Sequence, residues 1–225
     1  MTMSAPDLTF EQSLFAQDIE LLGAVDEVGR GSPAGPATCG IVVINAATGP
    51  VPTGLRDSKL LSGSKRAQLV PQIEQWAIDS AVGHATSLEV DEYGLTAALR
   101  VAGHRALAQL TVRPDAILLD GNFDWLSRPE QSDLWHPHVV VDVNVPPVAT
   151  RVKADLTCAS VAAASVLAKV ARDAVMTSLA KEYPEYGWAS NKGYGSAEHL
   201  DAVRRLGLTP HHRASWHFAG GSGTQ

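Results

Sequence analysis

The chain has 225 residues, a formal net charge of −6 and 45 % apolar residues. This length suits one domain, or one domain with an appendage, and it is long enough to bury a full hydrophobic core. No stretch approaches the roughly 18 consecutive apolar residues of a membrane span, so we expect no contact with a membrane. Residues 1–20 carry acidic side chains and no basic one, which argues against a signal peptide.

The two cysteines, Cys39 and Cys158, lie in separate apolar stretches without a CxxC motif. This pattern predicts core thiols in a reducing cytoplasm rather than a disulfide or a zinc site. We therefore expect a cytoplasmic protein, and we expect it to be a monomer.

Charge is unevenly distributed along the chain. Residues 1–149 hold nine Lys and Arg against 18 Asp and Glu, a net charge of −9, whereas residues 150–225 hold nine against six, a net charge of +3. An acidic metal-binding part joined to a basic part suits a nuclease, because phosphate contacts provide most non-specific affinity for nucleic acid. Surface charge is also often lopsided by chance, so this asymmetry alone does not decide the function.

The first half of the chain predicts strands alternating with helices. Apolar and β-branched runs predict strands, and apolar residues at helical spacing predict helices, one of which has Asp91 as its N-cap. In chain order these elements are a strand over Leu21–Asp26, a strand over Thr38–Ala46, a helix over Ser64–Ile78, a strand over Ala81–Leu88 and a helix over Asp91–Leu110.

The second half begins with a short, wholly apolar strand over Ala116–Leu119. A strand without alternation predicts burial on both faces, and hence helices on both sides of a sheet. We also expect a strand over His138–Val143 and helices over Thr157–Leu179 and Ser196–Leu206. Together the elements predict an α/β fold with a central mixed sheet flanked by helices.

A polar segment with aromatic residues lies between the two later strands. It contains Phe123, Trp125 and Trp135. Exposed aromatic side chains in such a segment could stack on bases or form a partner surface. The plainer alternative, which we favour, is a small apolar cluster that covers the segment.

Two adjacent carboxylates, Asp26 and Glu27, end the first apolar run and are followed by Gly29, Arg30 and Gly31. An unpaired buried charge is costly, so a divalent cation is the best explanation for such a pair. Mg²⁺ binds one or two carboxylates and keeps positions for water and phosphate oxygens. Backbone N–H groups of a glycine-rich turn can approach a polyanion closely, with one guanidinium beside them.

Two further carboxylates are positioned to join this pair. Asp120 ends a buried strand, and Asp155 precedes the long helix. Because sites in open α/β sheets form beyond the carboxyl ends of strands, three segments can deliver carboxylates to one edge, as a two-metal site requires. Asp120 could instead form an Asx turn, and Asp155 could simply cap its helix.

Strand geometry raises an objection to Glu27. Successive strand residues point to opposite faces, so Asp26 and Glu27 cannot both reach one metal from a regular strand. The strand must end at Asp26, or a bulge must redirect Glu27. A regular strand continuing through Glu27 would take its carboxylate away from the metal.

The motifs resemble, in order, those of the ribonuclease HII family, over about residues 21–218. The matching segments are Val25 to Gly31 (VDEVGRG), Asp57 to Lys59 (DSK), Leu119 to Asn122 (LDGN), Lys153 to Asp155 (KAD), Ala163 to Asp173 (AASVLAKVARD) and Asn191 to Tyr194 (NKGY). The chain departs from the family pattern at Ser32-Pro33, at Leu60, where a second lysine is usual, and in the longer stretch between Asp120 and Asp155.

The resemblance implies a ribonuclease H-like fold with a C-terminal helical extension, which we place at residues 183–225 beside a catalytic region at 1–182. It implies Mg²⁺- or Mn²⁺-dependent hydrolysis of the RNA strand of RNA–DNA hybrids and of DNA containing ribonucleotides, as in replication and repair. The products would be 5′-phosphate and 3′-hydroxyl ends. A hard-ion site of this kind makes His211 and His212 improbable ligands.

The resemblance also implies roles for single residues. Asp26, Glu27, Asp120 and Asp155 would be the catalytic, metal-binding set. Gly29, Arg30 and Gly31 would sense the ribose 2′-hydroxyl, and Tyr194 would stack on the sugar of the following deoxynucleotide; the plainer alternative is a tyrosine that packs its own loop. Apart from the resemblance, Lys59 and Lys192 are candidate phosphate contacts, as any exposed lysine would be.

Two other classes of function remain open. An ATP-handling enzyme on a related sheet would also place an Asp at a strand end, but it should carry glycine-rich phosphate loops in both halves, and this sequence shows none. A silent hybrid-binding protein would gain nothing from four clustered negative charges near phosphate.

Overall fold

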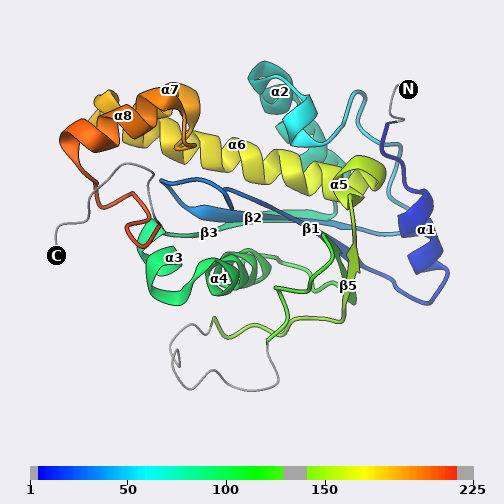
Figure 1. The fold of residues 1–225 in the computed structure, drawn as a ribbon. Helices are drawn as coiled ribbons and strands as arrows, with labels where there is room; N and C mark the ends of the chain where they lie inside the picture. The colour runs from blue at the N-terminus through cyan, green and yellow to red at the C-terminus, as the bar shows by residue number, and fades with distance from the viewer. Residues whose placement is uncertain (1–4, 129–140, 217–225) are drawn as a thin grey trace.

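The computed structural model describes residues 5–128 and 141–216, and it confirms a central mixed sheet with helices on both faces (Figure 1). The strand order is β3-β2-β1-β4-β5. Strand β1 pairs antiparallel with β2 and parallel with β4. The strands are β1 Leu22–Val28, β2 Ala37–Ile44, β3 Asp79–Ala85, β4 Ala116–Asp120 and β5 Val148–Arg151.

Helix α6 crosses one face of this sheet and α4 covers the opposite face (Figure 1). The helices are α1 Thr9–Phe15, α2 Gly63–Trp76, α3 Ser87–Tyr93, α4 Leu95–Leu107, α5 Ala154–Thr157, α6 Ala159–Glu182, α7 Trp188–Asn191 and α8 Ala197–Leu206. Two 3₁₀ turns, η1 Ser58–Leu60 and η2 Pro184–Tyr186, complete the described elements. In the part of the chain that the structure describes, no helix is long and apolar enough to cross a membrane.

The small residues of α6 let it pack closely on the sheet. A Cβ atom at Gly40 of β2 would collide with the backbone oxygen of Ala164 and lie 3.1 Å from the backbone nitrogen of Ala168. The first half of α6 is buried along its whole circumference from Ala159 to Ala168. Helix α6 therefore lies directly against β2, and the short α5 immediately precedes it in the chain.

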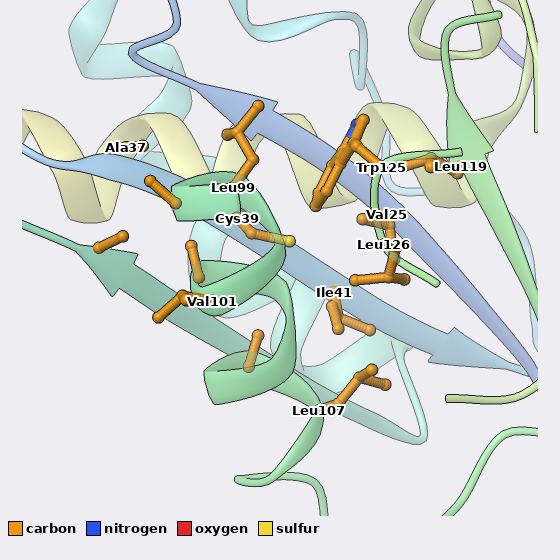
Figure 2. Close-up of a cluster of buried hydrophobic side chains, with 14 of the residues drawn as sticks. Val25, Ala37, Cys39, Ile41, Leu99, Val101, Leu107, Leu119, Trp125 and Leu126 are labelled. Atoms are coloured by element: carbon orange, nitrogen blue, oxygen red, sulfur yellow. The ribbon is translucent and has the colours of Figure 1, made fainter. Parts of the chain in front are cut away.

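The core on the other face of the sheet contains part of the aromatic segment. Figure 2 shows Trp125 and Leu126 among the buried side chains of β1, β2 and α4, including Val25 and Cys39. Trp125 is 2 % exposed and belongs to the main core on this face rather than to a separate small cluster over the segment. Phe123 is 61 % exposed, and Trp135 lies outside the described residues.

The prediction of one helix over Asp91–Leu110 was wrong. Thr86 forms a capping box with Glu89 that starts α3 at Ser87, and Gly94, with φ 77°, separates α3 from α4. The strand expected to run to Leu88 consequently ends at Ala85. Asp91 is not an N-cap; its carboxylate instead accepts hydrogen bonds from the C-terminal segment at Ala214 and Ser215.

The prediction of a strand over His138–Val143 was also wrong where it can be tested. Residues 141–143 form no strand, and residues 138–140 lie outside the described range. The fifth strand is β5, only four residues long and partly exposed, and it follows Pro146 and Pro147. Its apolar signal is weak because it lies at the edge of the sheet.

The C-terminal helices pack against the far end of α6. A third cluster joins Met176 of α6 to Trp188 of α7 and Val203 of α8. Both cysteines are buried free thiols, as predicted.

Candidate active site

Asp26 and Asp120 lie side by side at the ends of neighbouring parallel strands. Each directly follows one member of the register pair Val25 and Leu119. Ala24 and Leu118, one residue before that pair, belong to the core on the α6 side, so the alternation of a strand places both aspartates on the α6 face. The predicted meeting of these two carboxylates at one sheet edge is therefore observed.

Asp155 reaches the same place from α5. In the ladder between β4 and β5, Asp120 pairs with Arg151. The chain then turns into α5 through Lys153, whose φ of 59° is unusual for a residue with a side chain. Asp120 Oδ1 accepts hydrogen bonds from Ala154 N at 2.7 Å and from Asp155 N at 3.4 Å. Asp120 thus anchors the first turn of the helix that carries Asp155.

The carboxylates repel one another and are poorly solvated. Burial, followed by repulsion from Glu27 and Asp120, raises the pKa of Asp26 well above its usual value. Burial and repulsion from Asp155 raise the pKa of Asp120. Asp26 and Asp155 are only 4 % and 6 % exposed. This concentration of buried negative charge is stable only if a cation or protons neutralise it.

Lys59 provides one cation at the edge of this group. Its Nζ lies 3.2 Å from Asp155 Oδ2 and 3.9 Å from Asp57 Oδ2. Partial burial disfavours the charged form, but Asp57 and Asp155 still leave the pKa of Lys59 above its usual value. Asp57 is itself buried and caps η1 by accepting from Lys59 N. Lys59, which the sequence suggested as a phosphate contact, therefore contacts two of the protein's own carboxylates in the structure.

Glu27 does not lie on the same face as Asp26. Strand β1 is regular through Val28: Asp26 pairs with Gly40, Glu27 with Cys39 and Val28 with Thr38, so no bulge intervenes. The condition that would take Glu27 away from the metal is therefore met. Glu27 Oε1 accepts a hydrogen bond from Arg30 at 3.0 Å. Burial nevertheless raises the pKa of Glu27, with Arg30 opposing and Asp120 adding to the shift.

The donor set suits a hard divalent ion, although the described side chains do not form a closed cage. No group of three or more His, Cys, Asp or Glu side chains in residues 5–128 and 141–216 is arranged to hold a metal. However, Glu27 Oε2 is buried without a hydrogen-bond partner in this part of the chain. The mutually repelling aspartates are the feature that a bound Mg²⁺ or Mn²⁺ would relieve, whereas the unpaired Oε2 belongs to Glu27 on the opposite face of β1.

Two buried arginines, Arg172 and Arg213, contact the glycine loop (Gly29, Arg30 and Gly31) and the residues that follow it. Arg213 donates to Gly29 O at 2.7 Å and to Arg30 O at 2.9 Å. A Cβ at Gly29, where φ is 90°, would collide with the side chain of Arg172 and lie 2.7 Å from Pro36 O. Gly31, in contrast, has no heavy atom within 4 Å of such a Cβ. The packing of the protein thus explains the glycine at Gly29 and leaves open space at Gly31.

Tyr194 lies next to this loop. Its ring, 36 % exposed, has the guanidinium carbon of Arg172 at 5.2 Å and Lys169 Nζ at 5.4 Å from its centroid. Lys192 Nζ donates to Thr177 Oγ1 at 2.9 Å and to Ala189 O, so its side chain is held against α6 and α7. The structure thus brings Tyr194 beside the loop and turns the Lys192 ammonium toward its own helices.

The sequence interpretation assigned no role to Arg172 or Arg213. Arg172 donates to Pro36 O, Ala34 O and Lys192 O. It therefore connects the segment that follows the glycine loop to the loop of Lys192 and Tyr194, called here the tyrosine loop. It is spaced four residues from Ala168 and from Met176, and all three are buried. An arginine on the buried stripe of a helix was the signal that could have identified it. Ser32, one of the departures from the family pattern, accepts from Arg172 Nη2 at 2.7 Å.

Comparisons with known proteins identify the family and the fold of this chain. The model of the family described as Ribonuclease HII matches residues 22–219. A Ribonuclease HII from Streptomyces coelicolor is 43 % identical over 219 residues, which cover 97 % of this chain and 86 % of the relative. The crystal structure of ribonuclease H2 from Pyrococcus horikoshii is similar with a TM-score of 0.63 and 25 % identity, covering 88 % and 95 % of the two chains.

A more distant structure, Bst-RNase HIII in complex with Mn²⁺, shares the fold with a TM-score of 0.60 and 21 % identity over 83 % of this chain and 61 % of that one. The mixed sheet, the flanking helices and the C-terminal helical part are therefore those of a ribonuclease H-like fold. The chain belongs to the ribonuclease HII family and is an endoribonuclease of the ribonuclease H class.

Proposed function

We propose that this chain hydrolyses the RNA strand of RNA–DNA hybrids, and also cuts at single ribonucleotides embedded in DNA, with two Mg²⁺ or Mn²⁺ ions. Membership of the ribonuclease HII family supports the first activity. The observation that carries the rest is the meeting of Asp26, Asp120 and Asp155 at one sheet edge beside a glycine loop. The proposed setting is the cytoplasm, in replication and repair, with the protein acting as a monomer.

In this proposal Asp26, Asp120 and Asp155 hold the ions from the α6 face, and Glu27, which lies on the opposite face of the regular strand β1, is not among the ligands. When bound, such ions lower the pKa of a water and neutralise charge on the phosphate, which would leave 5′-phosphate and 3′-hydroxyl ends. The role of Asp120 is also structural, because its Oδ1 holds the first turn of α5 and thereby aims Asp155.

Substrate choice is assigned to the loop and the tyrosine. A ribose 2′-hydroxyl can donate and accept, so it distinguishes RNA from DNA at one nucleotide. The open space at Gly31 and the exposed guanidinium of Arg30 support close approach by a sugar and its phosphate. The half-exposed ring of Tyr194 would pack on the next deoxyribose, where a 2′-oxygen would crowd it. Lys59 and Lys192 remain weaker candidates for phosphate contacts.

The test is incubation with Mg²⁺ or Mn²⁺ and two labelled duplexes, a continuous RNA–DNA hybrid and a DNA duplex with one ribonucleotide. We expect both to be cut, with 3′-hydroxyl and 5′-phosphate ends that a ligase and a phosphatase can identify. A duplex of DNA alone is the control and should stay intact. Tight binding without cleavage by the unaltered protein would identify a silent hybrid binder and contradict the proposal.

A further inference from the structure

Two buried histidines, His199 of α8 and His212 of the C-terminal segment, have no part in the proposed chemistry. Their Nε2 atoms lie 3.0 Å apart, and the two residues are 0 % and 1 % exposed. The indole Nε1 of Trp188 also donates to His199 Nε2, at 3.0 Å. The other ring nitrogen of His199, Nδ1, lies 2.9 Å from the backbone oxygen of Tyr194.

The neighbours of these rings determine where their protons lie. Thr209 N can only donate, and it lies 2.9 Å from His212 Nδ1, so that nitrogen accepts and carries no proton. The proton of a neutral His212 is then on Nε2, from which it is donated to His199 Nε2. The single lone pair of His199 Nε2 is therefore shared by the donors of His212 and Trp188, which leaves the His199 proton on Nδ1, directed at Tyr194 O.

Burial keeps this arrangement neutral. It lowers the pKa of His212 to about 4, with repulsion from His199 as the second cause, and it lowers the pKa of His199 as well. At neutral pH both imidazoles therefore hold one proton each, and the chain of donors from Thr209 to Tyr194 is unbroken.

Arg213, the residue after His212, contacts the glycine loop, which is the other segment proposed to recognise the substrate. Arg213 donates to the backbone oxygens of Gly29 and Arg30. Arg213 thus contacts the glycine loop directly, and its neighbour His212 contacts the tyrosine loop through His199. A change in either contact would move the Tyr194 ring relative to Gly29.

We propose that His199, as the tautomer protonated at Nδ1, is a positioning residue that sets Tyr194 relative to the glycine loop and so determines selectivity for a deoxynucleotide after the ribonucleotide. This inference rests on the proposed function. The Tyr194 carbonyl accepts from Ser196 N at 2.8 Å within its own turn and from His199 Nδ1 at 2.9 Å. The proposal requires the Nδ1 donor itself, beyond the volume of the ring, because it ties this carbonyl to α8 and, through His212, to the C-terminal segment.

Two variants distinguish the effect of the Nδ1 hydrogen-bond donor from the effect of the volume of the His199 ring. In His199→Asn the amide nitrogen takes the place of Nδ1 and keeps a donor toward Tyr194 O. In His199→Gln the amide reaches the place of Nε2, can accept from Trp188, and loses the donor. Both variants are compared with the unaltered protein on the single-ribonucleotide duplex and on the continuous hybrid, and their thermal unfolding is measured alongside.

The expected result is a ratio of single-ribonucleotide to hybrid cleavage that falls about tenfold in His199→Gln, the size of one buried hydrogen bond, and stays within about twofold in His199→Asn. An unchanged ratio in His199→Gln, or equal losses on both duplexes, overturns the proposal. If the unaltered protein cuts neither duplex, the proposed function fails instead.

Long-range ¹H–¹⁵N NMR of the unaltered protein provides a test that needs no variant to fold. We expect the His199 proton on Nδ1 and the His212 proton on Nε2. A His199 proton on Nε2 would overturn the proposal, because Tyr194 O would then have no donor from this ring.

Discussion

Lys59 Nζ lies 3.2 Å from Asp155 Oδ2, so an ammonium group borders the carboxylates proposed to bind metal. It also lowers the pKa values of Asp26 and Asp120, opposing their mutual repulsion. In the metal-free protein this lysine therefore stabilises the acidic group, and a divalent ion must share or replace its interactions.

Lys59→Met should consequently destabilise the metal-free protein and strengthen metal binding. Because the Lys59 side chain is 71 % exposed and its ion pairs are screened by solvent, we expect the unfolding midpoint without metal to fall by about 1–2 °C, the effect of roughly 0.5 kcal/mol in a chain of this size. Titration calorimetry with Mg²⁺ measures the change in affinity. Lys181→Met, on an exposed position in the last turn of α6, is the matched control and should change neither quantity. Weaker Mg²⁺ binding in Lys59→Met would show that the lysine assists the ion.

Asp120→Asn should abolish cleavage while preserving the fold. The side-chain oxygen that accepts from Ala154 N is retained by the amide, so we expect α5 to keep its place and hybrid binding to change little. Cleavage should fall by at least about 100-fold, as for loss of a residue that supports a metal site. Binding is measured by fluorescence anisotropy with the uncut hybrid. Full activity would move the site elsewhere.

The raised carboxylate pKa values have a defined consequence for pH. A group whose pKa is higher in the folded state stabilises less as pH rises from its unfolded value through its folded value. For Asp120 the unfolded value is about 3.8, so Asp120→Asn should match the unaltered metal-free protein below that pH. At higher pH the variant should become the more stable of the two. Chemical denaturation at several pH values, without metal, measures the difference; a difference independent of pH would contradict this reasoning.

The two glycines of the loop should respond differently to alanine. Gly29→Ala meets Arg172 and a strained φ, so it should cost about 1–3 kcal/mol of folding stability. Gly31→Ala meets open space, so stability should change by less than about 0.5 kcal/mol. If a ribose approaches Gly31 closely, the same variant should still lose about 10–100-fold of its cleavage rate. Normal cleavage by Gly31→Ala would remove Gly31 from the proposed sugar contact.

The aromatic segment provides another matched pair. Trp125 is buried in the core on the α4 face, so Trp125→Ala should cost about 3–5 kcal/mol. Phe123 is 61 % exposed, so Phe123→Ala should change stability by less than about 0.5 kcal/mol. Urea denaturation followed by circular dichroism compares them. A large loss from Phe123→Ala would mean that its ring packs against residues outside the described range.

The sheet and the aspartates at its edge could be predicted because they depend on local patterns. An apolar run that stops at a carboxylate and a glycine is visible in the sequence, and Asp26 and Asp120 both show it. The meeting of the two then follows from strand order. Helix ends were harder: the break at Gly94 depends on a backbone angle, and the capping box of Thr86 competed with an apparently continuous helical pattern.

What could not be predicted depends on distant contacts. Lys59 faces Asp155 across 96 positions of sequence, and Arg213 reaches Gly29 across 184. No spacing rule links such pairs, because they meet only when α6 and the C-terminal segment are folded. The orientation of Glu27 illustrates the opposite case: alternation along a strand predicted the difficulty, and the regular pairing to Val28 shows that it is real.

The register between β4 and β5 fixes both ends of the stretch that separates Asp120 from Asp155. Asp120 pairs with Arg151, and the turn through Lys153 then places Asp155. Both ends of the intervening stretch thus belong to one ladder, next to Asp120 and a few residues before Asp155. An insertion at the exposed Phe123, before the buried Trp125, should therefore leave Asp120 and Asp155 in place.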